Sequence, residues 1–67
     1  MKTMTAVLKY HRRILDATEN QKSILVSSIR VAPGEQESFD HALNDLVIDG
    51  MVRYTELNPE LKIKRMA

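Results

Sequence analysis

The stretch FDHALNDLVIDGMVRY, residues 39–54, specifies more of the architecture than any other part of the chain. Its first half places apolar residues along one side of a helix, namely Phe39, Ala42, Leu43 and Leu46. Gly50 supplies the left-handed residue that commonly ends a helix, and Val52 and Tyr54 then alternate with polar residues, as in a strand. The stretch therefore predicts a packed helix that passes directly into a strand.

The residues that follow predict a β-hairpin. A turn with Asn58 and Pro59 separates the strand from a second alternating segment, residues 61–64. We expect the apolar members of both strands to cover the helices: Val52, Tyr54, Leu61 and Ile63. We expect the basic members to face solvent: Arg53, Lys62 and Lys64.

Residues 3–18 show the clearest helix pattern outside that stretch. The residues of the expected buried side recur at helical spacing: Met4, Val7, Leu8, His11, Ile14 and Leu15. The charged residues project to the far side: Lys2, Lys9, Arg12, Arg13 and Asp16. We interpret this mostly basic side as an ordinary solvated face, with a phosphate-facing patch as the alternative.

Residues 23–30 carry a pattern that fits either a helix or a strand. Their β-branched residues favour a strand, whereas Ser23 could cap a short helix whose inward side is Ile24, Leu25 and Ser28. We predict a helix of about two turns over residues 23–30. Pro33 and Gly34 then end this segment before the next helix begins.

The composition restricts the class of protein. The chain has 67 residues and no cysteine, so we expect one domain, residues 1–67, without disulfides or thiolate metal sites. No segment reaches the roughly 20 apolar residues that span a membrane, and no signal peptide is recognisable, so we expect a soluble cytoplasmic protein. The charge is segregated: residues 1–13 contain four Lys or Arg and no acid, whereas residues 35–49 contain five acids and no Lys or Arg.

The order of these elements resembles the winged helix-turn-helix family. The resemblance rests on two leucines, an acid-glycine pair and a β-branched residue, which are Leu43, Leu46, Asp49, Gly50 and Val52. It covers residues 8–63 and implies an α+β fold with three helices and a C-terminal two-stranded wing. The short single domain also resembles a phage-type or mobile-element member of the family.

The resemblance implies a dimeric transcriptional regulator whose third helix enters the major groove of DNA while the wing touches the backbone. The residues that would bind nucleic acid are Gln36, His41, Asn44, Arg53, Lys62, Lys64 and Arg65. Additional attraction would come from Arg12, Arg13 and Arg30. The outward side of the third helix is acidic, however, and an acidic helix is repelled by the phosphates that supply most of the affinity for DNA.

That acidic side supports a second hypothesis, an adaptor or inhibitor that binds a basic protein surface and no DNA. Its contact residues would be Glu37, Asp40, Asn44, Asp45 and Ile48. In this hypothesis Ile48 is the apolar centre of the interface. In the interpretation that we favour from the sequence, the last helical turn tightens and Ile48 packs beneath the hairpin.

The remaining polar residues predict neither an enzyme nor a cofactor site. The serines have no neighbouring base and the chain has no glycine-rich phosphate loop. His11 is expected to pack in the core with a backbone or hydroxyl partner. Asp40, His41 and Asp45 point in different directions on a helix, and no second His or Cys stands at ligand spacing, so we expect no metal site.

Overall fold

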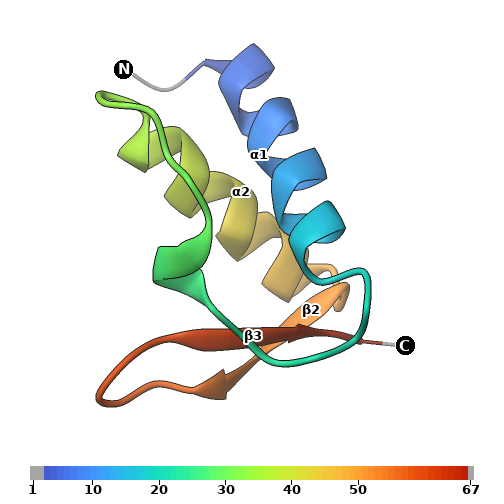
Figure 1. The fold of residues 1–67 in the computed structure, drawn as a ribbon. Helices are drawn as coiled ribbons and strands as arrows, with labels where there is room; N and C mark the ends of the chain where they lie inside the picture. The colour runs from blue at the N-terminus through green and yellow to red at the C-terminus, as the bar shows by residue number, and fades with distance from the viewer. Residues whose placement is uncertain (1–2, 67) are drawn as a thin grey trace.

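The computed structural model describes residues 3–66, which form a small α+β domain with two α-helices and a three-stranded antiparallel sheet (Figure 1). The helices are α1 (Met4–Ala17) and α2 (Gln36–Ile48). The strands are β1 (Ile24–Leu25), β2 (Val52–Glu56) and β3 (Lys62–Arg65). One 3-10 turn, Val26–Ser28, follows β1. The helices form one layer and the sheet forms the other, with the core between them.

Helix α1 confirms the predicted element but not its predicted buried side. Its first turn is capped by the Thr3 hydroxyl, which accepts a hydrogen bond from the Ala6 N–H at 3.1 Å. Met4 and Leu8 were expected to be buried, yet 70% and 56% of their surfaces are exposed. Tyr10, which the predicted stripe omitted, is instead fully buried and meets the Phe39 ring edge-on at 5.7 Å. This aromatic contact rotates the buried side of α1 toward Ala6, Val7, Tyr10 and Ile14.

The predicted helix over residues 23–30 is wrong, because this segment adds a third strand to the sheet. Ile24 pairs with Ile63 and Leu25 pairs with Lys62. The Val26 N–H, at the first residue of the 3-10 turn, then donates to the Leu61 carbonyl oxygen at 2.9 Å. This segment forms a strand because it can make ladder hydrogen bonds with the backbone edge of β3, and its β-branched residues favour that conformation.

The helix predicted in the first half of residues 39–54 is confirmed and forms the larger part of α2. Its buried residues are Ser38, Phe39, Ala42, Leu43 and Leu46. Gly50 ends the helix with a φ of +75°, a conformation that residues with a side chain adopt rarely. The Gly50 N–H donates to Val47 and the Met51 N–H to Leu46, as in a Schellman motif.

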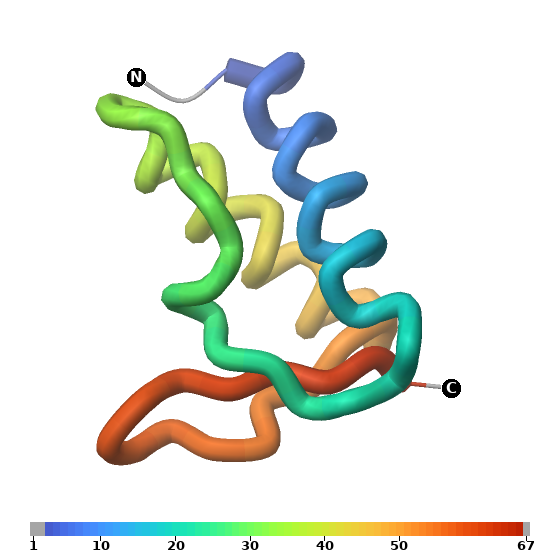
Figure 2. The backbone as a smooth tube through the Cα atoms, viewed as in Figure 1, coloured from blue at the N-terminus to red at the C-terminus, as the bar shows by residue number. Residues whose placement is uncertain are grey.

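The sheet has the strand order β1-β3-β2, so β3 is central and the chain crosses between the helices and the sheet several times (Figure 2). Val52 and Ile63 point into the core and are almost fully buried. Tyr54 and Leu61 were also expected to cover the helices, but their surfaces are 37% and 41% exposed, so each is only partly covered. Tyr54 lies on the edge strand beside a bulge and Leu61 lies in the turn before β3.

Candidate functional site

The outward side of α2 forms an acidic and polar surface, which we call the α2 surface. Its residues recur at helical spacing: Glu37, Asp40, His41, Asn44, Asp45 and Ile48. All are exposed except Asp45, which is half-buried. Three of the six are acids and none is Lys or Arg, so the surface repels polyanions and attracts cations.

Ile48 remains on this surface instead of packing beneath the hairpin. Its exposed fraction is 72%, the highest among the large apolar residues that the structure describes. The expected tightening of the last turn does not occur, because α2 stays regular through Ile48 and the left-handed Gly50 turns the chain away. Val52, which was expected to cover the helices, is almost fully buried, whereas Ile48 is not. The interpretation that we favoured from the sequence is therefore wrong.

Asp45 contacts two histidines, His11 of α1 and His41 of α2, and the first of these joins the α2 surface to α1. The distance from Asp45 Oδ2 to His11 Nε2 is 3.3 Å, and the distance to His41 Nε2 is 3.4 Å. His11 was expected to pack in the core with a neutral partner, but it is only half-buried and its partner is this carboxylate. Within residues 3–66, no group of three or more His, Cys, Asp or Glu side chains could hold a metal ion.

The predicted DNA-contacting residues divide between two separate surfaces. Gln36, His41 and Asn44 lie on the exposed side of α2, where the Gln36 amide donates to Asp40 Oδ1 at 2.8 Å. The hairpin cations follow the strand register, in which Arg53 lies opposite Lys64. Because Val52 and Ile63 point inward, their strand neighbours Arg53, Lys62 and Lys64 point to the other face of the sheet, away from α2.

Two of the basic residues near the hairpin already have partners within the domain. Lys62 Nζ lies 3.6 Å from Glu56 Oε2. Arg65 is the strand partner of Val52 and therefore points inward, where its guanidinium donates to the Leu15 carbonyl oxygen and to Thr18 Oγ1. Arg65 thus adds a second donor, beside the Thr18 hydroxyl, to a backbone carbonyl in the last turn of α1.

Cations of α1 are held in a similar way. Lys9 Nζ lies 2.6 Å from Glu35 Oε1, and Arg13 Nη1 donates to the Arg30 carbonyl oxygen at 2.8 Å. The Lys9 ammonium, followed by the Tyr10 hydroxyl, holds the pKa of the Glu35 carboxyl below its ordinary value. Arg12 and Arg30 are exposed, and Lys2 lies outside the described residues.

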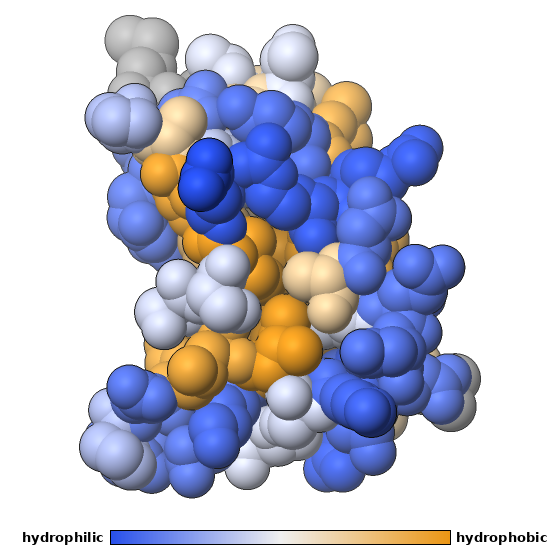
Figure 3. Space-filling model, in the orientation of Figure 1, coloured by the Kyte–Doolittle hydropathy of each residue, from blue (hydrophilic) through white to orange (hydrophobic). Residues whose placement is uncertain are grey.

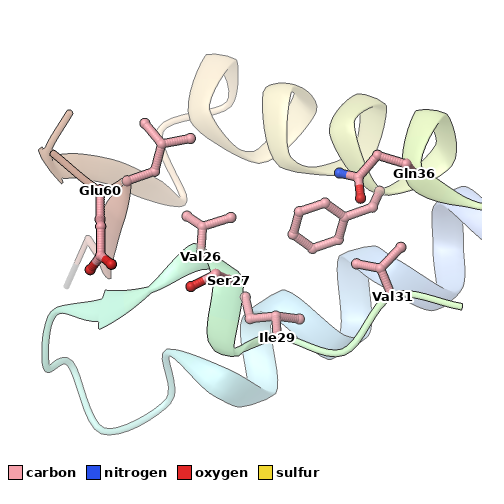
Figure 4. Close-up of a pocket in the computed structure, with 8 residues that line it drawn as sticks. Val26, Ser27, Ile29, Val31, Gln36 and Glu60 are labelled. Carbon is pink, nitrogen blue, oxygen red and sulfur yellow. The ribbon is translucent and has the colours of Figure 1, made fainter. Parts of the chain in front are cut away.

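An apolar hollow of about 570 Å³ opens beside the N-terminal half of α2, and we call it the groove. Figure 3 shows the apolar atoms that gather there between the helical layer and the sheet. Its walls come from the 3-10 turn, the segment after it, α2 and the hairpin turn: Val26, Ser27, Ile29, Val31, Gln36, Phe39, Glu60 and Leu61. Figure 4 shows Val26, Ile29 and Val31 along one side, Gln36 across from them and Glu60 at the hairpin end.

Sequence reasoning did not find the groove. Its walls join segments that are about 35 residues apart in the chain, from the 3-10 turn to the hairpin turn, and the sequence pattern for the first of these indicated a helix. The only signal in the sequence was the apolar run ILV at residues 24–26. The run is one residue longer than the strand β1, and its last residue, Val26, lines the groove.

No helix within residues 3–66 is both long and apolar enough to cross a membrane. Comparisons with protein-family models, with curated proteins and with solved structures find no match to this chain. The function must therefore be inferred from the α2 surface, the cations of the sheet and the groove.

Proposed function

We propose that the protein is a protein-binding adaptor or inhibitor that places the α2 surface on a basic surface of another protein. One observation carries the proposal: Ile48 is 72% exposed within a surface that is otherwise acidic and polar. An exposed apolar side chain surrounded by polar groups is the arrangement of an interface anchor. The acids around it would steer a cationic partner toward the anchor and suppress binding of anionic ones.

The charge distribution also supports this function over DNA binding through α2. A helix that reads DNA must approach a polyanion, and the exposed side of α2 offers acids but no Lys or Arg. The cations that were expected to compensate are elsewhere. Arg65 donates to the end of α1, and Arg53 and Lys64 lie on the opposite side of the sheet from α2.

Affinity capture with single-residue variants tests the proposal. Ile48→Ser removes the apolar anchor and Asp40→Lys reverses one charge of the α2 surface. A genuine partner is retained by the natural protein and by Leu57→Ser, an exposed apolar control in the hairpin turn, and it is lost from both α2 variants. If every protein captured by the natural chain is also captured equally by Ile48→Ser and Asp40→Lys, the α2 surface is not the binding site.

The winged-helix arrangement remains our proposal for the finer fold. Support comes from the chain order α1, β1, α2, β2, β3 and from the pairing of β1 with β3, which gives the strand order β1-β3-β2. In this proposal the 3-10 turn Val26–Ser28 stands where the family has its second helix. The domain would then be a winged helix with a reduced middle helix, and fold likeness alone leaves its function open.

DNA binding by a transcriptional regulator is the second candidate function. It is favoured by one observation, the three cations on the outer face of the sheet, which are Arg53, Lys62 and Lys64. Neighbouring cations on a strand pair can neutralise successive phosphates. In this candidate the sheet supplies the affinity, and its salt dependence is the test developed in the Discussion.

A further inference from the structure

The groove has the composition of a site for an apolar side chain. Its walls are largely apolar, with Val26, Ile29 and Val31 across from Gln36 of α2 (Figure 4), and Phe39 of α2 also lines it. Its volume of about 570 Å³ lies within the range of about 300 to 1,000 Å³ that is usual for binding sites. Because the groove is open to solvent (Figure 3), an entering side chain replaces water over apolar atoms, which is favourable.

The charges around the groove determine which apolar ligands it favours. None of its eight lining residues is Lys or Arg, and its one charged member is Glu60 at the hairpin end. Gln36 forms part of the opposite wall and donates to Asp40, a member of the α2 surface. Glu60 therefore places a carboxylate in the wall at the hairpin end, and Asp40 holds a second one beside Gln36, which favours a ligand that carries positive charge next to its apolar group.

The groove and Ile48 lie on the same helix. Gln36 and Ile48 are the two ends of α2, about 18 Å apart at 1.5 Å per residue. Asp40 and Asn44 lie between them on the exposed side. A partner that covers the α2 surface can consequently reach the groove without crossing another part of the fold.

We infer that the groove receives a bulky apolar side chain of the partner protein, flanked in the partner's sequence by Lys or Arg residues that lie near Glu60 and Asp40. This inference rests on the proposed protein-binding function and names the partner segment that would be recognised. The apolar side chain supplies the affinity, and the neighbouring cations supply the selectivity against acidic segments.

Short tryptophan peptides test the inference, because the protein itself contains no Trp and a peptide Trp reports binding by its fluorescence. The probe is acetyl-Gly-Lys-Trp-Lys-Gly-amide, and its matched control carries Glu in place of both Lys residues. We expect the lysine peptide to bind about fivefold more tightly than the glutamate peptide, as for partly exposed ion pairs. A peptide with Ala in place of Trp should fail to displace the probe.

Variants of the groove locate the binding. Leu61→Ser should weaken both Trp peptides about tenfold, whereas Leu57→Ser, in the same turn but outside the groove, should leave them unchanged. Glu60→Gln should remove most of the preference for lysine without affecting folding, since Glu60 is exposed. Circular dichroism shows whether each variant is folded.

The outcomes distinguish this inference from the proposed function. Equal binding of both Trp peptides, no binding of either, or unchanged binding to Leu61→Ser overturns the inference about the groove. In those cases the proposed function still stands if Ile48→Ser loses a captured partner. Conversely, lysine-selective binding that depends on Leu61 and Glu60 supports the groove, even if Ile48→Ser loses no partner.

Discussion

The hydroxyl of Tyr10 donates a hydrogen bond to the Glu35 carboxylate at 2.6 Å and so joins the middle of α1 to the residue before α2. The Tyr10 hydroxyl oxygen also accepts a hydrogen bond from the Ala32 N–H at 2.9 Å. The ring packs edge-on against Phe39. One buried side chain therefore fixes the connecting segment and the start of α2 relative to α1, and it indirectly positions the wall of the groove.

Replacing Tyr10 with Phe should destabilise the domain by about 1 to 3 kcal/mol. The substitution keeps the ring contact but leaves the Ala32 N–H without its partner, and an unpaired polar group in a packed region costs about that much. Urea denaturation followed by circular dichroism measures the change. Tyr54→Phe is the matched control, because Tyr54 is an exposed residue of β2. Equal stability of the two variants would show that the Tyr10 hydroxyl is not structurally important.

The ion pair of Lys9 and Glu35 should make the domain less stable in acid. The pKa of Glu35 is lowered, first by the hydrogen bond from Lys9 and then by that from Tyr10. A carboxyl with a lowered pKa in the folded state stabilises the fold above its ordinary pKa of 4.5, and this contribution disappears as the pH falls through the folded-state pKa.

Glu35→Gln should therefore unfold at a lower temperature than the natural protein at neutral pH, and this difference should shrink as the pH falls below 4.5. Thermal unfolding at a series of pH values measures it. Lys9→Met should weaken the same dependence, since the hydrogen bond with Lys9 is the largest cause of the lowered pKa of Glu35. A difference that stays constant with pH would assign the effect of Glu35 to packing instead of charge.

Arg65→Met should lower the free energy of unfolding by about 1.5 to 3 kcal/mol. The Arg65 guanidinium donates to the Leu15 carbonyl oxygen and to Thr18, and hydrogen bonds that involve a charged group contribute about this amount. Arg53→Met is the matched control, because Arg53 is exposed on the same sheet and should change stability by less than about 0.5 kcal/mol. Chemical denaturation compares the two, and a larger loss in Arg53→Met contradicts the assigned role of Arg65.

The sequence predicted the parts of the fold that local patterns control. The α2 stripe and the Gly50 stop each depend on residues within about two helical turns, so periodicity and glycine geometry were sufficient. Residues 23–30 could not be predicted in the same way. Their strand depends on ladder hydrogen bonds to β3, which lies about 40 residues further along the chain. The burial of Tyr10 likewise depends on Phe39, a distant contact that a helical wheel does not contain.

The candidate site was predicted in composition but not in arrangement. The acidic side of α2 follows from helical spacing, and the structure places those residues together. Arg53 and Lys64 lie on the other face of the sheet from α2 because Val52 and Ile63 point inward. This could be deduced only once the strand pairing was known. The groove required three segments to meet. Only local surfaces were therefore accessible to sequence reasoning.

Ile48→Ser should leave the free energy of unfolding within about 0.5 kcal/mol of the natural protein, because Ile48 is exposed and little apolar burial is lost. Leu46→Ser, two residues earlier and buried, should destabilise by several times that amount. Thermal or urea unfolding of both variants measures the contrast. Strong destabilisation by Ile48→Ser would mean that Ile48 belongs to the core, and the α2 surface would then lose its anchor.

Duplex DNA binding, if it takes place through the sheet, should weaken steeply with salt. Each phosphate neutralised by a cation contributes about 0.9 to the slope of log affinity against log salt concentration. Replacing both Lys62 and Lys64 with Ala should therefore flatten the slope by about two units, as measured by mobility-shift titrations at several salt concentrations. Lys22→Ala removes an exposed cation that is not among the expected DNA contacts and should leave the slope unchanged.

The same titrations separate the two candidate functions. Retention of duplex DNA at low salt, with the flattened slope in the Lys62 and Lys64 double variant, favours the transcriptional regulator. If duplex DNA is not retained at low salt, DNA binding is excluded. Low salt screens charges least, so attraction between the phosphates and the sheet is strongest under that condition. In that event two candidate sites remain, namely the α2 surface, with Ile48 exposed among its acids, and the groove.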